Sequence, residues 1–392
     1  MTPKTQPIDL ESRAAAFSVQ PAETPQRVIV ALSGGVDSAV AAWLLREAGH
    51  DVTGVSLRLA PEDGPRADAG RCCSVDDMTD ARQLCDLIGI PFYAIDARDR
   101  FREAVFEPFV RDYRAGLTPI PCLACNHEVK FGDLLRTATS LGAQLATGHY
   151  ARVVQFAGFT TMARPSDRAR DQTYYLYGTP SEAMGTLLLP LGDLDKPLVR
   201  ALAQRAGIPV HDKPDSQEIC FVPDGDHARV VEKASGKLPG GRVVHVDGRD
   251  LGEHQGVHRY TVGQRRSLHV GGHGGRLYVL DVDGESHRVV VGPREHLASR
   301  RVLLHDVNAL VPSAAWPEVV EVQVRARHRA QAARWEPRDD GSVELTFEDD
   351  VEAVALGQAG VIYTGDTLLG GGIISGRLDG AFPRVSRLPV LA

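Results

Sequence analysis

A glycine-rich segment near the start of the chain has the composition of an anion-binding loop. Residues 33–38 read Ser-Gly-Gly-Val-Asp-Ser and directly follow an apolar run at 28–32. If that run is a strand and a helix follows, the glycine N–H groups converge on an anion at the positive end of the helix. The hydroxyls of Ser33 and Ser38 add donors, and Asp37 could hold a Mg²⁺ ion that bridges phosphates. A plain turn capped by serine is the alternative, but the full pattern favours nucleotide phosphate binding. No Gly-Lys-Ser/Thr follows, so the loop is not of the P-loop NTPase type.

The same six residues resemble the pyrophosphatase loop of ATP-dependent adenylating enzymes, which release pyrophosphate and form an acyl- or base-adenylate. That superfamily includes synthetases for GMP, argininosuccinate and asparagine, as well as RNA thiolases. The resemblance predicts adenylation without choosing among these reactions.

Three cysteines supply thiol chemistry. Cys122 and Cys125 lie on one tight segment just before a predicted helix at 130–139, and a helix start favours the thiolate. Half of a zinc site is the alternative, but zinc usually takes four ligands and the chain has no second Cys-x-x-Cys. Cys220, between Ile219 and Phe221, would alone be interpreted as a buried apolar cysteine. Beside an adenylating loop and another reactive cysteine, that interpretation is no longer favoured.

The elements that must position these residues alternate between strand and helix up to about residue 209, and this alternation predicts a doubly wound parallel sheet. The predicted strands are 28–32, 52–57, 92–95 and 144–146, and the predicted helices are 39–47, 76–88, 101–113, 130–139 and 198–206. After Pro214, short β-type runs separated by Gly and Asp-Gly turns are typical of small antiparallel barrels. These runs are 242–246, 260–262, 277–280, 288–291, 302–304, 319–324, 343–347 and 361–363.

Length and composition limit the class of protein. A chain of 392 residues suggests two or three domains, and no apolar run approaches the 18 or so residues of a membrane helix. The net charge of −7 excludes a general polycation, and six cysteines without a secretion signal favour a cytoplasmic protein with reactive thiols. We expect a flexible extension at 1–26, an ATP-binding α/β domain at 27–212, a central β-rich domain at 213–298 and a C-terminal β-barrel at 299–392.

Several motifs together resemble the tRNA-specific 2-thiouridylase family, in the order in which that family has them. The match covers nearly the whole chain, from about Arg27 to Ile374. Its motifs are 33–38, Cys122–Phe131, Ala146–Arg152, Asp171–Leu176, Lys213–Val222, Tyr260–Arg266 and Gly370–Ile374. The family implies an adenylating α/β domain, a small central β-rich domain and a C-terminal barrel. It also implies that ATP and sulfur relayed from a cysteine desulfurase replace O2 of the wobble uridine in tRNA of the Lys, Glu and Gln acceptors. We expect a monomer with no membrane association.

The resemblance assigns roles residue by residue. The ATP-binding positions are Ala31, Leu32, Ser33, Gly34, Gly35, Val36, Asp37, Ser38, Leu57 and Gly148. Cys125 matches the nucleophile and Cys220 the persulfide carrier. Ile120, Pro121 and Cys122 match the stretch that faces the target base, and the positions that touch tRNA are His149, Arg170, Asp171, Gln172, Arg327, His328 and Gln358.

Two residues depart from the family pattern. Cys122 stands where many members have an Asp that acts as a base toward the persulfide, and Ile120 replaces a common Asn. A thiolate at Cys122 could accept a proton, or Cys122, Cys125 and Cys220 could ligate a [4Fe–4S] cluster whose open iron binds sulfide. Persulfide relay is the favoured interpretation, and the cluster stays open as the alternative.

The best local patch for RNA is 325–329, which reads Arg-Ala-Arg-His-Arg, with Arg334 and Trp335 nearby. Alternation along a strand would put Arg325, Arg327 and Arg329 on one face, with Trp335 or His328 available to stack on a base. Arg265–Arg266 is a weaker candidate, and Arg71-Cys72-Cys73 is typical of the family without an assignable role.

Two other classes of function compete with tRNA thiolation. A small-molecule adenylating synthetase would leave the three cysteines and the basic barrel without a use. A non-catalytic RNA-binding redox or iron–sulfur sensor would not need the intact 33–38 loop.

Overall fold

The computed structural model describes residues 10–59, 75–215, 219–222, 225–268 and 275–386. The chain divides into two compact units, each built from several stretches of sequence. Unit 1 comprises Met1–Phe101, Asn126–Thr173 and Glu182–Pro223, and unit 2 comprises Arg102–Cys125, Tyr174–Ser181 and Asp224–Ala392. The Arg71–Cys73 motif and residues 216–218 of the Cys220 segment lie outside the described residues.

Unit 1 is built on a five-stranded parallel sheet in the order β3-β2-β1-β4-β7. Its strands are β1 (Arg27–Ala31), β2 (Asp51–Arg58), β3 (Phe92–Asp96), β4 (Gln144–Thr147) and β7 (Leu187–Leu188). The central strand β1 is an unbroken buried run at Val28–Val30, as a parallel strand covered on both faces requires. The strand order reverses between β1 and β4, and ligands of open α/β sheets bind at such a point beyond the carboxyl ends of the strands.

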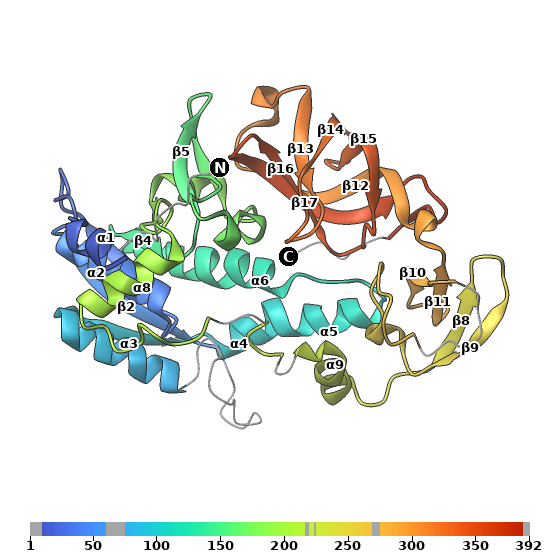
Figure 1. Cartoon of the computed structure of the whole chain (residues 1–392), viewed down its shortest axis with the longest axis horizontal. Helices are drawn as coiled ribbons and strands as arrows, with labels where there is room; N and C mark the ends of the chain where they lie inside the picture. The colour runs from blue at the N-terminus through green and yellow to red at the C-terminus, as the bar shows by residue number, and fades with distance from the viewer. Residues whose placement is uncertain (1–9, 60–74, 216–218, 223–224, 269–274, 387–392) are drawn as a thin grey trace, which may run out of the picture. The chain divides into compact units, whose positions relative to one another are not determined.

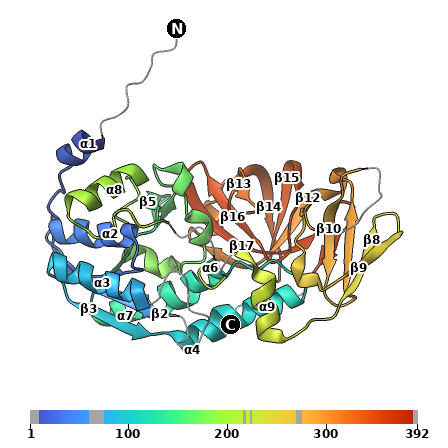
Figure 2. The same ribbon diagram turned by 60° about the horizontal axis from the view of Figure 1, so that its bottom comes forward.

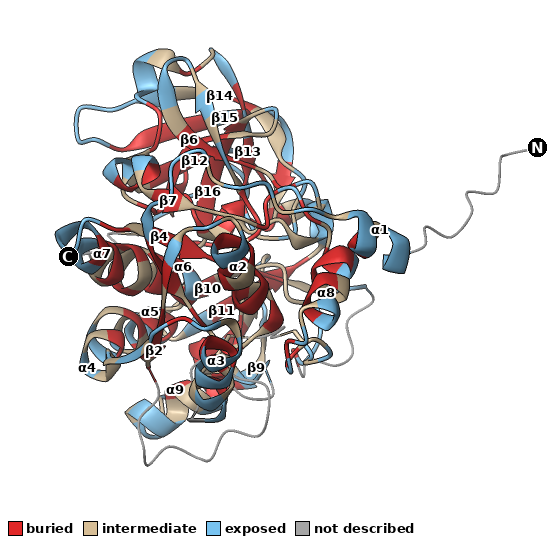
Figure 3. Cartoon of the chain, turned by 90° about the vertical axis from the view of Figure 1, so that its left-hand side faces the viewer, coloured by how far each residue is buried: buried red, intermediate tan, exposed pale blue. Residues whose placement is uncertain are grey.

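Helices α1 (Leu10–Ala16), α8 (Lys196–Arg205), α2 (Val36–Glu47) and α3 (Val75–Ile88) follow one another in a row in unit 1 (Figure 2). Helix α2 is rich in alanine and buried on most sides, because it packs with both the sheet and α8 into one apolar core. Helix α8 is buried on one side and exposed on the other (Figure 3). Unit 1 also holds α4 (Arg98–Phe101), α7 (Leu135–Ser140) and the hairpin β5 (Arg152–Phe156) and β6 (Phe159–Ala163).

The segment predicted as a flexible extension contains α1. Arg13 forms an ion pair of 2.8 Å with Asp195, and Arg205 donates to the Phe17 carbonyl at 2.9 Å. From Leu10 onward, this segment therefore departs from the prediction, because it packs on α8.

Unit 2 contains a four-stranded sheet and a closed barrel (Figure 1). The sheet has the order β10-β11-β8-β9, from β8 (Gly241–His245), β9 (Asp250–His254), β10 (Tyr278–Asp283) and β11 (Arg288–Gly292). The barrel follows the order β12-β15-β14-β13-β16-β17, and β17 pairs back to β12, so its six antiparallel strands leave no open edge. They are β12 (Ala298–Ala309), β13 (Val319–Gln323), β14 (Gln331–Pro337), β15 (Val343–Glu352), β16 (Ala359–Thr364) and β17 (Thr367–Arg377), and β18 (Arg384–Val385) pairs with β17.

The predicted fold class is confirmed, whereas several element boundaries are wrong. The predicted helix 101–113 is divided into the π-helical stretch Arg102–Phe106 and α5 (Glu107–Arg114). The predicted helix 130–139 lies within a longer helical run made of α6 (Pro121–Ala124), the π-helical stretch Cys125–Leu134 and α7. The cysteines therefore lie on helical turns, because Pro121 already begins the helix.

The predicted strand 260–262 is not a strand. It follows a 3₁₀ turn at Val257–Arg259, and the flanking Gly256 and Gly263 have φ values of 139° and 90°, outside the range of a strand. Helix α9 (His227–Ser235) completes unit 2. No helix within the described part of the chain is both long enough and apolar enough to span a bilayer.

Candidate active site

The loop between β1 and α2 in unit 1 is folded tightly around Ser38. The Ser33 N–H donates to Ser38 Oγ at 3.1 Å, and Ser38 Oγ donates to the Gly35 carbonyl at 3.1 Å. Gly34 has φ of 72°, and a Cβ there would lie 2.5 Å from the Asp77 carbonyl oxygen. Only glycine fits this position, so the chain can turn sharply from the strand into the helix.

The carboxyl end of β4 approaches the first turn of α2. A Cβ on Gly148 would lie 2.5 Å from the Ser38 nitrogen, so two backbones meet there without a side chain between them. The predicted ATP-binding positions 31–38 and Gly148 are thus brought together where the strand order reverses. Leu57 is buried near the end of the neighbouring strand β2, where the Leu32 N–H also donates to the Val55 carbonyl at 2.8 Å.

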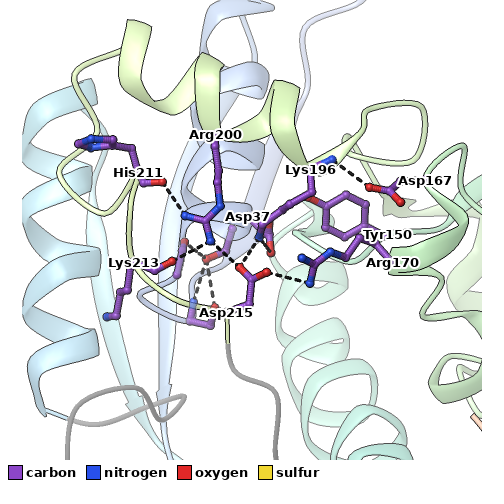
Figure 4. Close-up of polar contacts among 12 residues, drawn as sticks. Asp37, Tyr150, Asp167, Arg170, Lys196, Arg200, His211, Lys213 and Asp215 are labelled. Carbon is purple, nitrogen blue, oxygen red and sulfur yellow. Dashed lines mark hydrogen bonds and ion pairs between the residues drawn. The ribbon is translucent and has the colours of Figure 1, made fainter. Parts of the chain in front are cut away.

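Asp37, at the start of α2, is held by two partners from distant parts of unit 1 (Figure 4). Lys196 Nζ lies 2.7 Å and 2.8 Å from its two carboxylate oxygens, and the Tyr150 hydroxyl donates to Oδ1 at 2.8 Å. The Lys196 side chain is only 6% exposed, so its charge requires this compensation. Sequence reasoning missed Lys196, because nothing in its neighbourhood distinguishes it from any lysine in the first turn of a helix.

Asp215 forms ion pairs with three cations, one of which is the same lysine. Lys196 lies 2.7 Å from its carboxylate, Arg170 2.8 Å and Arg200 2.9 Å. Burial alone would raise the pKa of Asp215, but the hydrogen bond and charge of Lys196, with the two arginines, lower it below its usual value. Asp37 and Asp215 are therefore joined through one buried ammonium group (Figure 4).

Lys213 makes a second connection between this segment and the loop. Its Nζ donates to the Gly34 carbonyl at 3.0 Å and to Asp77 and Asp80 at 2.8 Å and 2.6 Å. Burial opposes the charged form, but hydrogen bonds to the two carboxylates raise the pKa of Lys213. The Lys213–Asp215 stretch, which leads toward Cys220, is thus fixed to the predicted nucleotide loop. Cys220 itself is half-buried.

The cysteine segment (Thr118–Cys125) belongs to unit 2 and is anchored on the barrel. The Thr118 N–H donates to the Leu356 carbonyl at 2.8 Å, and Gln358 Nε2 donates to the Thr118 carbonyl at 3.0 Å. The Tyr174 hydroxyl lies 3.3 Å from Gln358 Oε1. On the helical turn that follows, Cys122 is exposed, whereas Cys125 is 7% exposed.

Tyr175 connects the cysteine segment with a predicted RNA contact. The pKa of Tyr175 is raised, mainly by burial and further by the charge of Cys122, while the charge of Arg327 opposes the increase. Tyr175 also packs edge-on against Tyr174, with ring centroids 5.4 Å apart. Cys122 and Arg327 therefore share one neighbourhood within unit 2.

Comparison with known proteins decides the family. Residues 26–224 match the tRNA methyl transferase HUP domain, 229–293 the tRNA methyl transferase PRC-barrel domain and 299–374 the aminomethyltransferase beta-barrel domain. The chain is 47% identical over 367 residues to the tRNA-specific 2-thiouridylase MnmA of Rhodospirillum centenum, with 91% of this chain and 93% of the relative covered. It is 44% identical to the MnmA protein of Zymomonas mobilis, with 91% and 95% covered. The chain belongs to the tRNA-specific 2-thiouridylase family.

The domain names mention methyl transfer, whereas these relatives, which match 91% of the chain, are named 2-thiouridylases, enzymes that transfer sulfur. Identity of 47% over 91% of the chain outweighs the names of the separate domain models. Among solved structures, NMN synthetase from Francisella tularensis matches with a TM-score of 0.32 and 20% identity, covering 55% of this chain and 79% of that one. This overlap is too small to bear on the site.

Three of the residues that the family resemblance predicts to contact tRNA form hydrogen bonds or ion pairs within unit 1. His149 Nδ1 lies 2.8 Å from Thr147 Oγ1, and burial, with the charge of Lys130, lowers the pKa of His149 to about 3. Asp171 pairs with Arg164, and Gln172 Oε1 accepts from the Tyr150 N–H at 2.8 Å. Their contact with tRNA stays a prediction, as it does for Arg170 and, in unit 2, for Ile120, Pro121, Arg327, His328 and Gln358.

The basic patch of the thiouridylase barrel is a turn rather than a strand. β13 ends at Gln323, whose side chain donates to the carbonyls of Arg325 and Ala326 at 3.1 Å and 2.8 Å and closes the turn. Arg325, Arg327 and Arg329 are nevertheless exposed at alternate positions.

The predicted stacking role of Trp335 is not favoured by its packing. Its ring packs on Trp316 at 5.0 Å, and its Nε1 donates to the Pro317 carbonyl at 2.9 Å. Arg334 pairs with Glu318, while the weaker candidates Arg265 and Arg266 are exposed.

The cluster alternative receives no support from the donor set. Across the described ranges, no three His, Cys, Asp or Glu side chains are grouped so that they could hold a metal ion.

Proposed function

We propose that this protein catalyses ATP-dependent 2-thiolation of the wobble uridine (U34) of tRNA. The observation that carries the proposal is the Ser33–Ser38 loop at the reversal of strand order, in a chain of which 91% matches a 2-thiouridylase. A loop of backbone donors at a helix start suits the phosphates of ATP. ATP is required because the uracil C2 carbonyl is a poor electrophile whose oxygen leaves badly.

The first step is adenylation. The uracil O2 attacks the α-phosphate of ATP, pyrophosphate leaves, and O2 becomes part of a good leaving group, AMP. In this step the N–H groups at the start of α2 bind phosphate, while the hydroxyls of Ser33 and Ser38 hold the loop in its folded shape. Lys196 fixes Asp37, whose Oδ2 accepts one hydrogen bond from that lysine and keeps a lone pair for a Mg²⁺ ion brought in with ATP. Such an ion would neutralise phosphate charge.

The second step is sulfur transfer from a persulfide on Cys220. Its terminal sulfur attacks C2 and AMP leaves, so a C2–S–S–Cys220 linkage forms. The Cys125 thiolate then attacks Cys220 Sγ, which leaves 2-thiouridine on the tRNA and a Cys125–Cys220 disulfide in the protein. The 7% exposure of Cys125 suits a thiol that meets an extruded base rather than solvent.

The remaining partners are those that the family resemblance implies. The persulfide would come from a cysteine desulfurase or a sulfur-relay protein in the cytoplasm, and the substrates would be the Lys, Glu and Gln acceptor tRNAs. The exposed arginines at 325, 327 and 329 would contact phosphates and position the tRNA. We expect the protein to act as a monomer.

The test is mass spectrometry of nucleosides from tRNA. Cells that lack the protein should lose 2-thiouridine from the three acceptor tRNAs, and the wild-type gene should restore it. Cys125→Ser and Cys220→Ser should each abolish thiolation while tRNA binding persists. Unchanged 2-thiouridine in the deletion strain would refute the proposal.

A further inference from the structure

The two cysteines of the cysteine segment lie one helical turn apart. The Cys125 N–H donates to the carbonyls of both Pro121 and Cys122, so the intervening residues form a closed turn of helix. Residues three apart in a helix have their Cα atoms about 5 Å apart and project from the same face. A disulfide requires a Cα separation of roughly 4.4–6.8 Å. Cys122 and Cys125 therefore satisfy the first requirement for a disulfide without unfolding the turn.

The two thiols differ sharply in access. Cys125 is 7% exposed, whereas Cys122 is exposed. The proposed sulfur transfer leaves Cys125 in a disulfide with Cys220, and this bond must be reduced before a second turnover. A dissolved reductant reaches a buried sulfur slowly, since exchange requires in-line attack by a thiolate on that sulfur.

We infer that Cys122 is a resolving cysteine that resets the enzyme after each sulfur transfer. This inference rests on the proposed function. The Cys122 thiolate attacks Cys125 Sγ, the Cys122–Cys125 bond forms, the Cys125–Cys220 bond breaks, and Cys220 leaves as a thiolate ready for the next persulfide. An external dithiol then attacks the exposed Cys122 sulfur, is itself oxidised to its disulfide, and returns both cysteines to thiols. No electrons are gained or lost in the internal exchange.

The exposed position of Cys122 favours this role over that of a metal ligand. Within the described residues, no group of three ligands accompanies it. A resolving thiol needs one neighbour at disulfide distance and a path to solvent, and Cys122 has both. An Asp at this position could act as a base toward the persulfide, but it could not exchange disulfides.

Trypsin separates the two disulfides cleanly, because Cys122 and Cys125 share the peptide 115–130 while Cys220 lies on 206–229. The experiment uses the full-length protein loaded with persulfide, ATP and unmodified tRNA, without reductant, quenched with N-ethylmaleimide after one turnover. The wild-type protein should yield peptide 115–130 lighter by two hydrogen atoms. Cys122→Ser and Cys122→Asp should instead yield 115–130 cross-linked to 206–229.

Turnover gives the second readout. With a dithiol present, the later turnovers of Cys122→Ser and Cys122→Asp should be roughly tenfold or more slower relative to each variant's own first turnover, whereas the wild type should show no such drop. Full cycling of Cys122→Asp would show that a base is sufficient and would overturn the resolving role. So would a wild-type protein that accumulates only the cross-linked peptides, or one whose anaerobic preparation holds iron that Cys122→Ser loses.

The same experiment distinguishes a failure of the proposed function from a failure of the resolving role. A wild-type protein that makes no 2-thiouridine in the first turnover refutes tRNA thiolation, and the resolving role with it, even if the 115–130 disulfide forms in oxidised dithiothreitol. A protein that makes 2-thiouridine but never forms the 115–130 disulfide refutes the resolving role alone.

Discussion

Replacing Lys196 with methionine should loosen the predicted nucleotide loop by a measurable amount. Its ammonium group, on a side chain that is 6% exposed, lies within 2.8 Å of Asp37 and Asp215. Removing one partner of a buried ion pair costs about 3–5 kcal/mol. Two features reduce this cost, because Asp37 is 32% exposed and Asp215 keeps Arg170 and Arg200. We expect a loss of about 2–3 kcal/mol in the free energy of local opening, a factor of roughly 30 to 150.

Native-state hydrogen exchange of the amides in β1 and in the first turn of α2 measures this opening directly. The control is Lys233→Met on the exposed side of α9, which should change stability by less than about 0.5 kcal/mol. If Lys196→Met exchanges at the wild-type rate, the ion pairs do not hold the loop, and the role given to Lys196 is refuted.

Four further outcomes are expected. Gly148→Ala should weaken ATP binding at least tenfold by calorimetry, because its Cβ would force two backbones apart at a cost of about 1–3 kcal/mol. Gln358→Ala should lower kcat for thiolation more than it raises KM for tRNA, since this amide holds the cysteine segment; the reverse pattern would favour a direct tRNA contact. Arg327→Ala should weaken tRNA binding uniformly and reduce the salt slope by about one, which filter binding over a salt series measures. His149 has a pKa of about 3 when folded, against about 6.5 unfolded, so the unfolded state takes up the proton first and stability falls as pH drops below 6.5. Because the ring is half-buried, we expect a loss of about 1 kcal/mol at pH 5 that His149→Gln abolishes in urea unfolding; an unchanged slope would contradict this.

The sequence predicted the sheet of unit 1 well because its signal is local. The buried run at Val28–Val30, the sharp turn at Gly34 and the helix after it are read within a dozen residues. The barrel was likewise evident from short apolar runs between turns. The wrong strands at 260–262 and 325–329 share one cause. Each segment has a strand-like pattern of residues. At 260–262 the flanking glycines turn the backbone, and at 325–329 the side chain of Gln323 holds it in a turn by hydrogen bonds.

The contacts that the sequence could not show join residues far apart in the chain. Lys196 lies 159 positions from Asp37 in the chain, and Gln358 lies 240 positions from Thr118. No spacing rule connects such residues, because their proximity follows from the packing of whole elements. The sequence identified the cysteines as reactive groups. Their difference in exposure, however, is visible only in the folded segment, and the resolving role depends on it.

The central claim is that ATP is consumed to make the uridine oxygen leave. It is tested most directly by giving the enzyme tRNA with ¹⁸O at O2 of the wobble uridine, together with ATP and a persulfide source. We predict that each 2-thiouridine formed is matched by one AMP that carries the ¹⁸O in its phosphate. Formation of 2-thiouridine with unlabelled AMP, or with no AMP at all, would contradict the mechanism.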